Sequence, residues 1–141
     1  MISNAEIKKV LVTGGMGFIG SHFLLKCCQR FPGIEFINVD NLSYAVSPRT
    51  QGELSEFHNY SFHETDICDL IALEKIFQNH DVDLVIHFAA ESHVDNSIEA
   101  PLQFINTNIL GTFNLLTCIR KVNDAGQDIY FHHISTDEVY G

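Results

Sequence analysis

The sequence predicts an α/β fold in which five parallel strands form a doubly wound sheet of order 3-2-1-4-5. Short apolar runs alternate with segments of helical periodicity, which is typical of repeated βαβ units. A glycine-rich turn separates the first apolar run from the first helical segment. The length of 141 residues, 45% of them hydrophobic and 18% charged, fits one globular domain. These three observations together carry the prediction.

Each strand is predicted from a short apolar run bounded by turn residues. The run at 84–88 is continuously apolar, as expected for a central strand that helices cover on both faces. Pro32-Gly33 ends the segment before the second strand, and Gly126 marks the break before the fifth. The predicted strands are residues 10–13, 34–40, 60–65, 84–88 and 129–135.

The helices are predicted from apolar residues that recur every three or four positions. One helix spans 18–30, a second follows the capping residue Asp69, and the longest begins near Pro101. Residues 41–59 are predicted to be a loop with room for a short helix. We expect the apolar stripe of the longest helix to lie in the core; its members are Leu102, Ile105, Ile109, Phe113 and Leu116.

Composition excludes several classes of function. The formal net charge is −10 and no basic stretch exceeds two residues, so nucleic acid and acidic membranes are not expected partners. No apolar run reaches the roughly 18 residues of a membrane helix, and the first residues lack a signal peptide, which predicts a cytoplasmic protein. The four cysteines form no C-x-x-C and the histidines no metal-binding motif, so we expect reduced thiols and no metal.

A dinucleotide-binding motif follows the first strand. The run Thr13-Gly14-Gly15-Met16-Gly17-Phe18-Ile19-Gly20 satisfies both G-x-G-x-x-G and the related T-G-x-x-G-x-x-G spacing. It lies where a strand ends and a helix begins, as binding of a pyrophosphate at a helix N-terminus requires. Asp40 follows 20 residues after Gly20, where a carboxylate can accept hydrogen bonds from ribose hydroxyls and would repel the extra phosphate of NADP. The motif predicts a Rossmann domain that binds NAD.

The acidic pair Asp137-Glu138 follows the fifth predicted strand. Adjacent acids are usually solvent-facing, but the carboxyl ends of parallel strands form the rim where doubly wound sheets bind ligands. Thr136 places a hydroxyl beside the pair. The position therefore makes these residues candidates for acid and base catalysis.

These motifs resemble the extended short-chain dehydrogenase/reductase family, and within it the dTDP-glucose 4,6-dehydratases. The resemblance covers essentially the whole chain as the N-terminal part of such enzymes. The glycine motif is common to the superfamily, whereas the Ala-Ala-Glu-Ser-His-Val-Asp run and the Thr-Asp-Glu triplet are more specific to the dehydratases. The motifs that carry it are residues 13–20, 39–45, 65–69, 87–97, 107–112 and 135–141.

The resemblance implies a role for each motif. Gly14, Gly17 and Gly20 form the phosphate turn, and Phe18 and Ile19 cover the pyrophosphate. The residues implied to hold the adenosine ribose are Asp40, Asn41, Leu42 and Ser43, and those at the adenine edge are Asp66 and Ile67. The nicotinamide half is implied to contact Phe88, Ala89, Ala90, Ser92 and Thr107, with Ser92 and Thr136 also near the sugar. Asp137 is the implied proton donor and Glu138 the implied base.

The implied reaction converts dTDP-glucose to dTDP-4-keto-6-deoxyglucose. The C4 hydroxyl is oxidised with hydride passing to NAD, which makes the C5 proton acidic. Glu138 removes this proton while Asp137 assists loss of the C6 hydroxyl as water, and hydride returns to C6. The resemblance thus implies a lyase of deoxysugar biosynthesis with a nucleotide-sugar substrate, and a homodimer for the full-length enzyme.

The chain departs from the family by lacking the Y-x-x-x-K pair of the oxidation step. The positions four residues after Tyr44, Tyr60 and Tyr130 are Pro48, Glu64 and Ile134, and only Gly141 follows Tyr140. We therefore expect residues 1–141 to be an incomplete NAD-binding domain without its substrate lobe, inactive by itself. Two alternatives remain open: a UDP-sugar 4-epimerase or decarboxylase of the same family, and a non-catalytic NAD-binding module.

Overall fold

The computed structural model describes residues 7–43, 48–92, 98–136 and 139. Five parallel strands form one sheet of order β3-β2-β1-β4-β5, as the sequence predicts. Each strand lies within one or two residues of its predicted bounds. The strands are β1 (Lys9–Thr13), β2 (Glu35–Asp40), β3 (Tyr60–Glu64), β4 (Leu84–His87) and β5 (Tyr130–His133).

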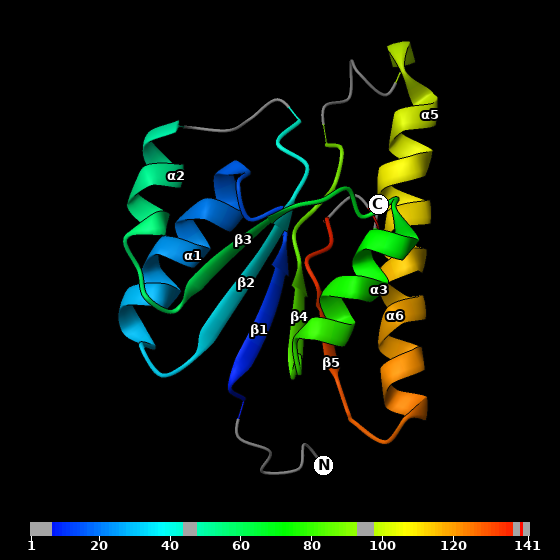
Figure 1. Cartoon of the computed structure of the whole chain (residues 1–141). Helices are drawn as coiled ribbons and strands as arrows, with labels where there is room; N and C mark the ends of the chain where they lie inside the picture. The colour runs from blue at the N-terminus through cyan, green and yellow to red at the C-terminus, as the bar shows by residue number, and fades with distance from the viewer. Residues whose placement is uncertain (1–6, 44–47, 93–97, 137–138, 140–141) are drawn as a thin grey trace.

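Helices cover both faces of this sheet (Figure 1). On one face lie α1 (Phe18–Arg30) and α2 (Pro48–Ser55), and on the other lie α3 (Leu70–Asn79) and α6 (Thr112–Asp124). The α2 helix is the short helix for which the predicted loop left room. At the start of α3 the Asp69 carboxylate accepts a hydrogen bond from the Ala72 N–H at 3.0 Å, so the expected cap is present.

Two apolar cores result from this arrangement. β1 alternates between them, because successive side chains of a strand point to opposite faces. Leu11 packs in the core beneath α3 and α6, whereas Val10 and Val12 pack beneath α1 and α2. Because all five strands are parallel, their carboxyl ends lie together at one edge of the sheet, where a ligand site can form.

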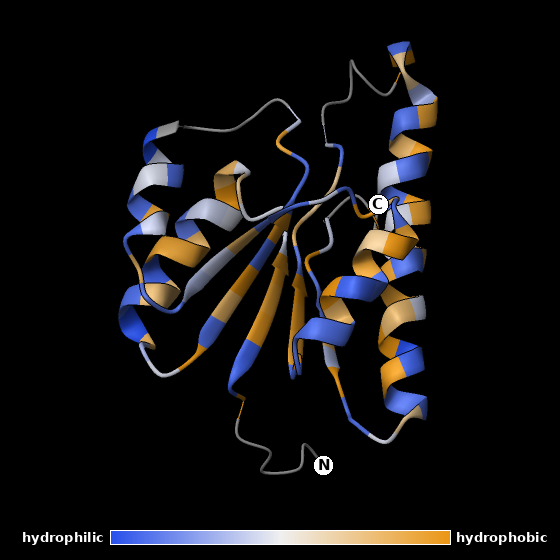
Figure 2. Cartoon of the chain, in the orientation of Figure 1, coloured by the Kyte–Doolittle hydropathy of each residue, from blue (hydrophilic) through white to orange (hydrophobic). Residues whose placement is uncertain are grey.

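The long helix runs without interruption through three segments. These are α5 (Pro101–Phe104), a π-helical segment η1 (Ile105–Gly111) and α6. The expectation that its apolar stripe is core is wrong: Leu102, Ile109 and Phe113 are 72%, 64% and 62% exposed. Figure 2 shows hydrophobic residues recurring along this helix as well as on the strands. The helix has two apolar faces, and the inner one, with Leu115, Cys118 and Ile119, is the face that packs on the sheet.

The structure also bears on the predictions for the cysteines and for membrane helices. Cys28 and Cys118 are buried and all four cysteines are free, which fits reduced thiols. Burial raises the pKa of both buried thiols to about 11, so they are protonated at neutral pH. Among the described residues no helix combines the length and the apolar character needed to cross a membrane.

The end of α1 depends on one buried amide. The Asn59 side-chain nitrogen lies 3.2 Å, 3.1 Å and 2.9 Å from the carbonyl oxygens of Cys28, Phe31 and Ile34. We expect Asn59→Ala to lower the free energy of unfolding by about 2 kcal/mol, because buried carbonyls lose their donor. Urea unfolding measures this, with the exposed Gln51→Ala as control. Equal midpoints for the two variants would contradict it.

Candidate functional site

A cleft of about 1160 Å³ lies at the carboxyl edge of the sheet. The ends of β1, β2, β4 and β5, the start of α1 and the inner side of the long helix form its walls. Every described residue that the sequence assigned to a site lines this cleft except Leu42. Those residues are Gly14, Gly17, Phe18, Ile19, Gly20, Asp40, Asn41, Ser43, Asp66, Ile67, Phe88, Ala89, Ala90, Ser92, Thr107 and Thr136.

The glycine turn allows the close backbone approach that the motif predicts. Gly14 has a φ of 69°, and a Cβ there would lie 2.5 Å from the Ala89 nitrogen. A Cβ on Gly20 would overlap the Gly14 carbonyl oxygen. The turn therefore packs directly against the loop after β4, and neither Gly14 nor Gly20 has room for a side chain.

The start of α1 opens into the cleft. Gly17 precedes the helix without a side-chain cap, and the first turn contains no acidic residue. The first backbone bond within the helix is from the Ser21 N–H to the Gly17 carbonyl oxygen, so the preceding N–H groups lack partners inside the helix. With Phe18 and Ile19 78% and 63% exposed at the same place, this end offers donors and apolar cover to an anion.

Asp40 lies at the end of β2, next to the glycine turn. Its Oδ2 accepts the Met16 N–H at 2.8 Å and its Oδ1 accepts the Leu42 N–H at 2.9 Å. The second bond holds Leu42 in the left-handed region, at φ 55°. The Leu42 side chain packs with the core beneath α1 and α2 rather than in the cleft. Asp40 is thus fixed before any ligand arrives, and each of its oxygens keeps a further lone pair for a hydroxyl donor.

A second aspartate, Asp66, lies in the loop after β3, the strand next to β2. The Asp66 Oδ1 accepts the Cys68 N–H at 2.8 Å, and its Oδ2 accepts the Asn41 side-chain N–H at 3.3 Å. The Thr65 N–H also donates to the Asp40 carbonyl at 3.0 Å. These bonds join the loops after β2 and β3 into one wall, with the residues predicted for ribose and adenine side by side.

The loop after β4 is held from the long helix. The Asn108 side chain accepts the Glu91 N–H at 2.8 Å and donates to the Glu91 carbonyl at 3.0 Å. The Gln103 amide donates to the Glu91 carboxylate at 3.1 Å. Glu91 is buried and also lines the cleft, so these bonds fix the wall at this residue. Glu91 and Asn108 were not among the predicted site residues, although both lie within motifs that carry the family resemblance.

The structure describes only part of the segment after β5 that the sequence predicts to be catalytic. Ser135 and Thr136 line the cleft at the end of β5, as does Val139, whose N–H donates to the Thr136 carbonyl at 3.4 Å. Asp137 and Glu138 lie outside the described residues. Thr136 therefore shares one cleft with the glycine turn, which the acid/base hypothesis requires.

Two further observations bear on ligand type. Within the described ranges, no three His, Cys, Asp or Glu side chains are grouped as a metal site would need. Helix N–H donors, glycines without Cβ atoms and the Asp40 carboxylate together fit a dinucleotide, whose charge lies on its pyrophosphate and whose ribose offers hydroxyl donors. At about 1160 Å³ the cleft is slightly larger than the roughly 300–1,000 Å³ of most small-molecule sites, which leaves room for a dinucleotide.

Comparison with known proteins agrees with this geometry. The sequence matches the profile of the family described as GDP-mannose 4,6 dehydratase over residues 11–141. It is 46% identical over 138 residues to dTDP-glucose 4,6-dehydratase of Shigella flexneri, which covers 94% of this chain and 38% of the relative. The corresponding enzyme of Neisseria meningitidis serogroup B is 44% identical over 140 residues, which covers 96% of this chain and 39% of the relative.

Solved structures show the same fold. A dTDP-glucose 4,6-dehydratase from Bacillus anthracis in complex with NAD superposes with a TM-score of 0.81 at 34% identity, covering 95% of this chain and 39% of that one. The UDP-Glc/GlcNAc 4-epimerase of Campylobacter jejuni superposes with a TM-score of 0.82 at 30% identity and the same coverage. The chain thus spans about two fifths of the length of these proteins. By the profile match over nearly its whole length, it belongs to the GDP-mannose 4,6 dehydratase family.

Proposed function

We propose that the cleft binds NAD and that residues 1–141 form the cofactor-binding domain of a sugar-nucleotide 4,6-dehydratase. The observation that carries the proposal is that the glycine turn, Asp40, Asp66, Ala89 and Thr136 all line one cleft. The pyrophosphate would lie at the start of α1 and the adenosine between the two aspartates. The nicotinamide would then lie toward Ala89 and Thr136. NAD in the solved Bacillus anthracis dehydratase supports this choice of cofactor.

The proposed reaction is that of a lyase acting on dTDP-glucose, as the names of the relatives support. Bound NAD supplies a hydride acceptor and donor. Glu138 takes the C5 proton of the oxidised sugar, and Asp137 gives a proton to the departing C6 hydroxyl. Two adjacent carboxyl groups in a dehydrated cleft differ in proton affinity, so one can be base while the other is acid. Ser92 and Thr136 would hold the sugar.

A substrate lobe and a tyrosine–lysine pair are part of this proposal. The relatives extend well beyond the length of this chain, which leaves room for both. Residues 1–141 alone would then be inactive. We also propose that the full-length enzyme is a cytoplasmic homodimer. The exposed stripe of the long helix supports dimerisation, because a continuous apolar helix face normally packs on another surface. A monomeric mass for the full-length protein would contradict it.

A 4-epimerase is the second candidate, since an epimerase structure superposes as well as the dehydratase does. The acidic pair favours the dehydratase, because C4 epimerisation removes no water from C6.

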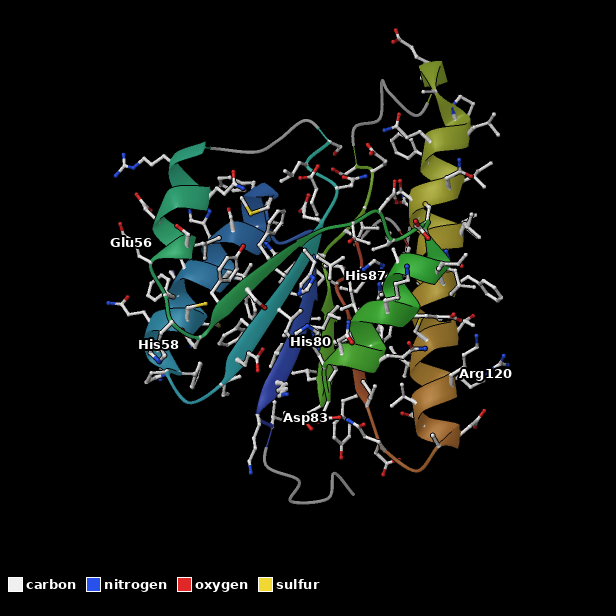
Figure 3. All side chains as sticks on the ribbon, viewed as in Figure 1. Glu56, His58, His80, Asp83, His87 and Arg120 are labelled. Carbon is white, nitrogen blue, oxygen red and sulfur yellow. The ribbon has the colours of Figure 1, made fainter. Side chains whose placement is uncertain are left out.

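The test is product analysis of the full-length enzyme with dTDP-glucose and UDP-glucose. We expect dTDP-4-keto-6-deoxyglucose from the first. Asp137→Asn and Glu138→Gln should each lower turnover at least about 100-fold by removing a general acid or base, while C4 oxidation persists. Glu56→Gln is a matched control, because this exposed carboxylate lies beside α2, away from the cleft (Figure 3). Unchanged turnover in both variants, or a C4 epimer as product, would overturn the proposal.

A further inference from the structure

A chain of hydrogen bonds crosses the core beneath the cleft and passes through His87, the last residue of β4. The His87 Nδ1 lies 2.6 Å from the Thr13 hydroxyl at the end of β1. Its Nε2 lies 3.0 Å from the Thr112 hydroxyl on the long helix. The Thr112 hydroxyl in turn donates to the Asn108 carbonyl at 2.9 Å. Figure 3 shows His87 between the sheet and the α3/α6 layer.

The donors and acceptors along this chain determine the state of the imidazole. Because the Thr112 proton is used at the Asn108 carbonyl, Thr112 can only accept from His87, so Nε2 carries the hydrogen. Nδ1 then bears a lone pair and accepts from the Thr13 hydroxyl. A neutral ring with its hydrogen on Nε2 therefore satisfies both nitrogens. The side chain is 1% exposed, and burial, followed by the nearby His133, lowers the pKa of His87 to about 4.

Both ends of this chain of hydrogen bonds reach the cleft. Thr13 Oγ1 also lies 3.5 Å from the Ala89 nitrogen, the atom that a Cβ on Gly14 would strike. At the other end Thr112 lines the cleft, and Asn108 pairs with the Glu91 backbone. The loop after β4 is therefore tied at Ala89 through β1 and at Glu91 through the long helix. The shared element between the two ties is the His87 ring.

We propose that His87 is a positioning residue. Through Thr13 and Thr112 it fixes the position of the 88–92 loop relative to the glycine turn. The position of this loop then determines how well the nicotinamide end of the cofactor is bound. This inference rests on the proposed NAD site. The adenosine wall, built by Asp40 and Asp66, shares no hydrogen bond with the His87 chain among those described. Loss of His87 should therefore weaken binding of the nicotinamide half of the cofactor and leave binding of the adenosine half unchanged.

The test compares NAD with ADP-ribose, which lacks the nicotinamide. In the full-length protein we expect His87→Phe to weaken NAD binding about tenfold, the effect of losing buried hydrogen bonds, and to change ADP-ribose binding less than about twofold. Thr112→Val, nearly the same size as threonine, should weaken NAD binding in the same sense. Thr112→Ser, which keeps the hydroxyl, should restore it. Calorimetry gives each affinity.

The outcomes separate the two proposals. A wild-type protein that binds neither ligand would contradict the NAD site itself. If wild type binds both, then equal losses for NAD and ADP-ribose, or none, in His87→Phe and Thr112→Val would overturn the positioning role. In a double-mutant cycle, the effects of Thr112→Val and His87→Phe should fall short of additive. Full additivity would also overturn it.

Discussion

Replacing Gly14 with alanine is expected to lower the free energy of unfolding by about 3 kcal/mol and to abolish measurable NAD binding. Two effects act at this position. The φ of 69° is strained for any residue with a Cβ, and the added carbon would lie 2.5 Å from the Ala89 nitrogen. Relief of that overlap must move the glycine turn away from the loop after β4. The pyrophosphate and nicotinamide ends of the proposed site would then separate.

Alanine substitutions at two other glycines separate the effect of backbone strain from that of steric overlap. Gly126 has a φ of 100° but open space where a Cβ would lie, so alanine there meets only the backbone strain. Gly33 has neither a positive φ nor a neighbour within 4 Å of that position. Urea unfolding should rank the alanine variants with Gly14 most destabilised, Gly126 next and Gly33 near wild type, and only the first should lose NAD in calorimetry. Tight NAD binding by Gly14→Ala would contradict the geometry of the site.

The sheet could be predicted because its signals are local. An apolar run such as residues 84–88 marks a strand wherever it lies, and the right-handed βαβ rule then orders the strands. The glycine motif and Asp40 were predictable for the same reason, since the turn, the helix start and the acid follow at fixed distances along the chain. The structure adds that Asp40 also bonds to the Met16 N–H, a contact that spacing alone does not reveal.

The face of the long helix could not be predicted, because both of its sides carry apolar residues. Leu102 to Leu116 form the more regular stripe, yet Leu115, Cys118 and Ile119 pack on the sheet. On the inner side of the helix, Asn108 and Thr112 form hydrogen bonds with Glu91 and His87, which lie 17 and 25 residues away in the sequence. Periodicity shows that a helix is amphipathic, but only the tertiary contacts decide which face the sheet covers.

Acid should destabilise the folded protein in a window set by His87. Its pKa in the fold is about 4, below the ordinary 6.5, first because the ring is buried and second because His133 lies beside it, with ring centroids 5.2 Å apart. Between these two values the unfolded chain binds a proton that the folded chain does not. The free energy of unfolding therefore falls as pH drops from 6.5 to about 4, by about 3 kcal/mol from this residue.

His87→Gln isolates this contribution, because glutamine keeps an amide but does not titrate. Burial and His80 also lower the pKa of His63, but His63 lies on β3, which does not neighbour β4, so it contributes alike in both proteins. The measurement is urea unfolding of wild type and variant at pH 7.5, 6, 5 and 4. We expect the variant to be less stable at pH 7.5 and the difference to shrink steadily toward pH 4. Parallel stability curves would mean that His87 has the same pKa in the folded and unfolded states, which would contradict the buried neutral ring that accepts from Thr13.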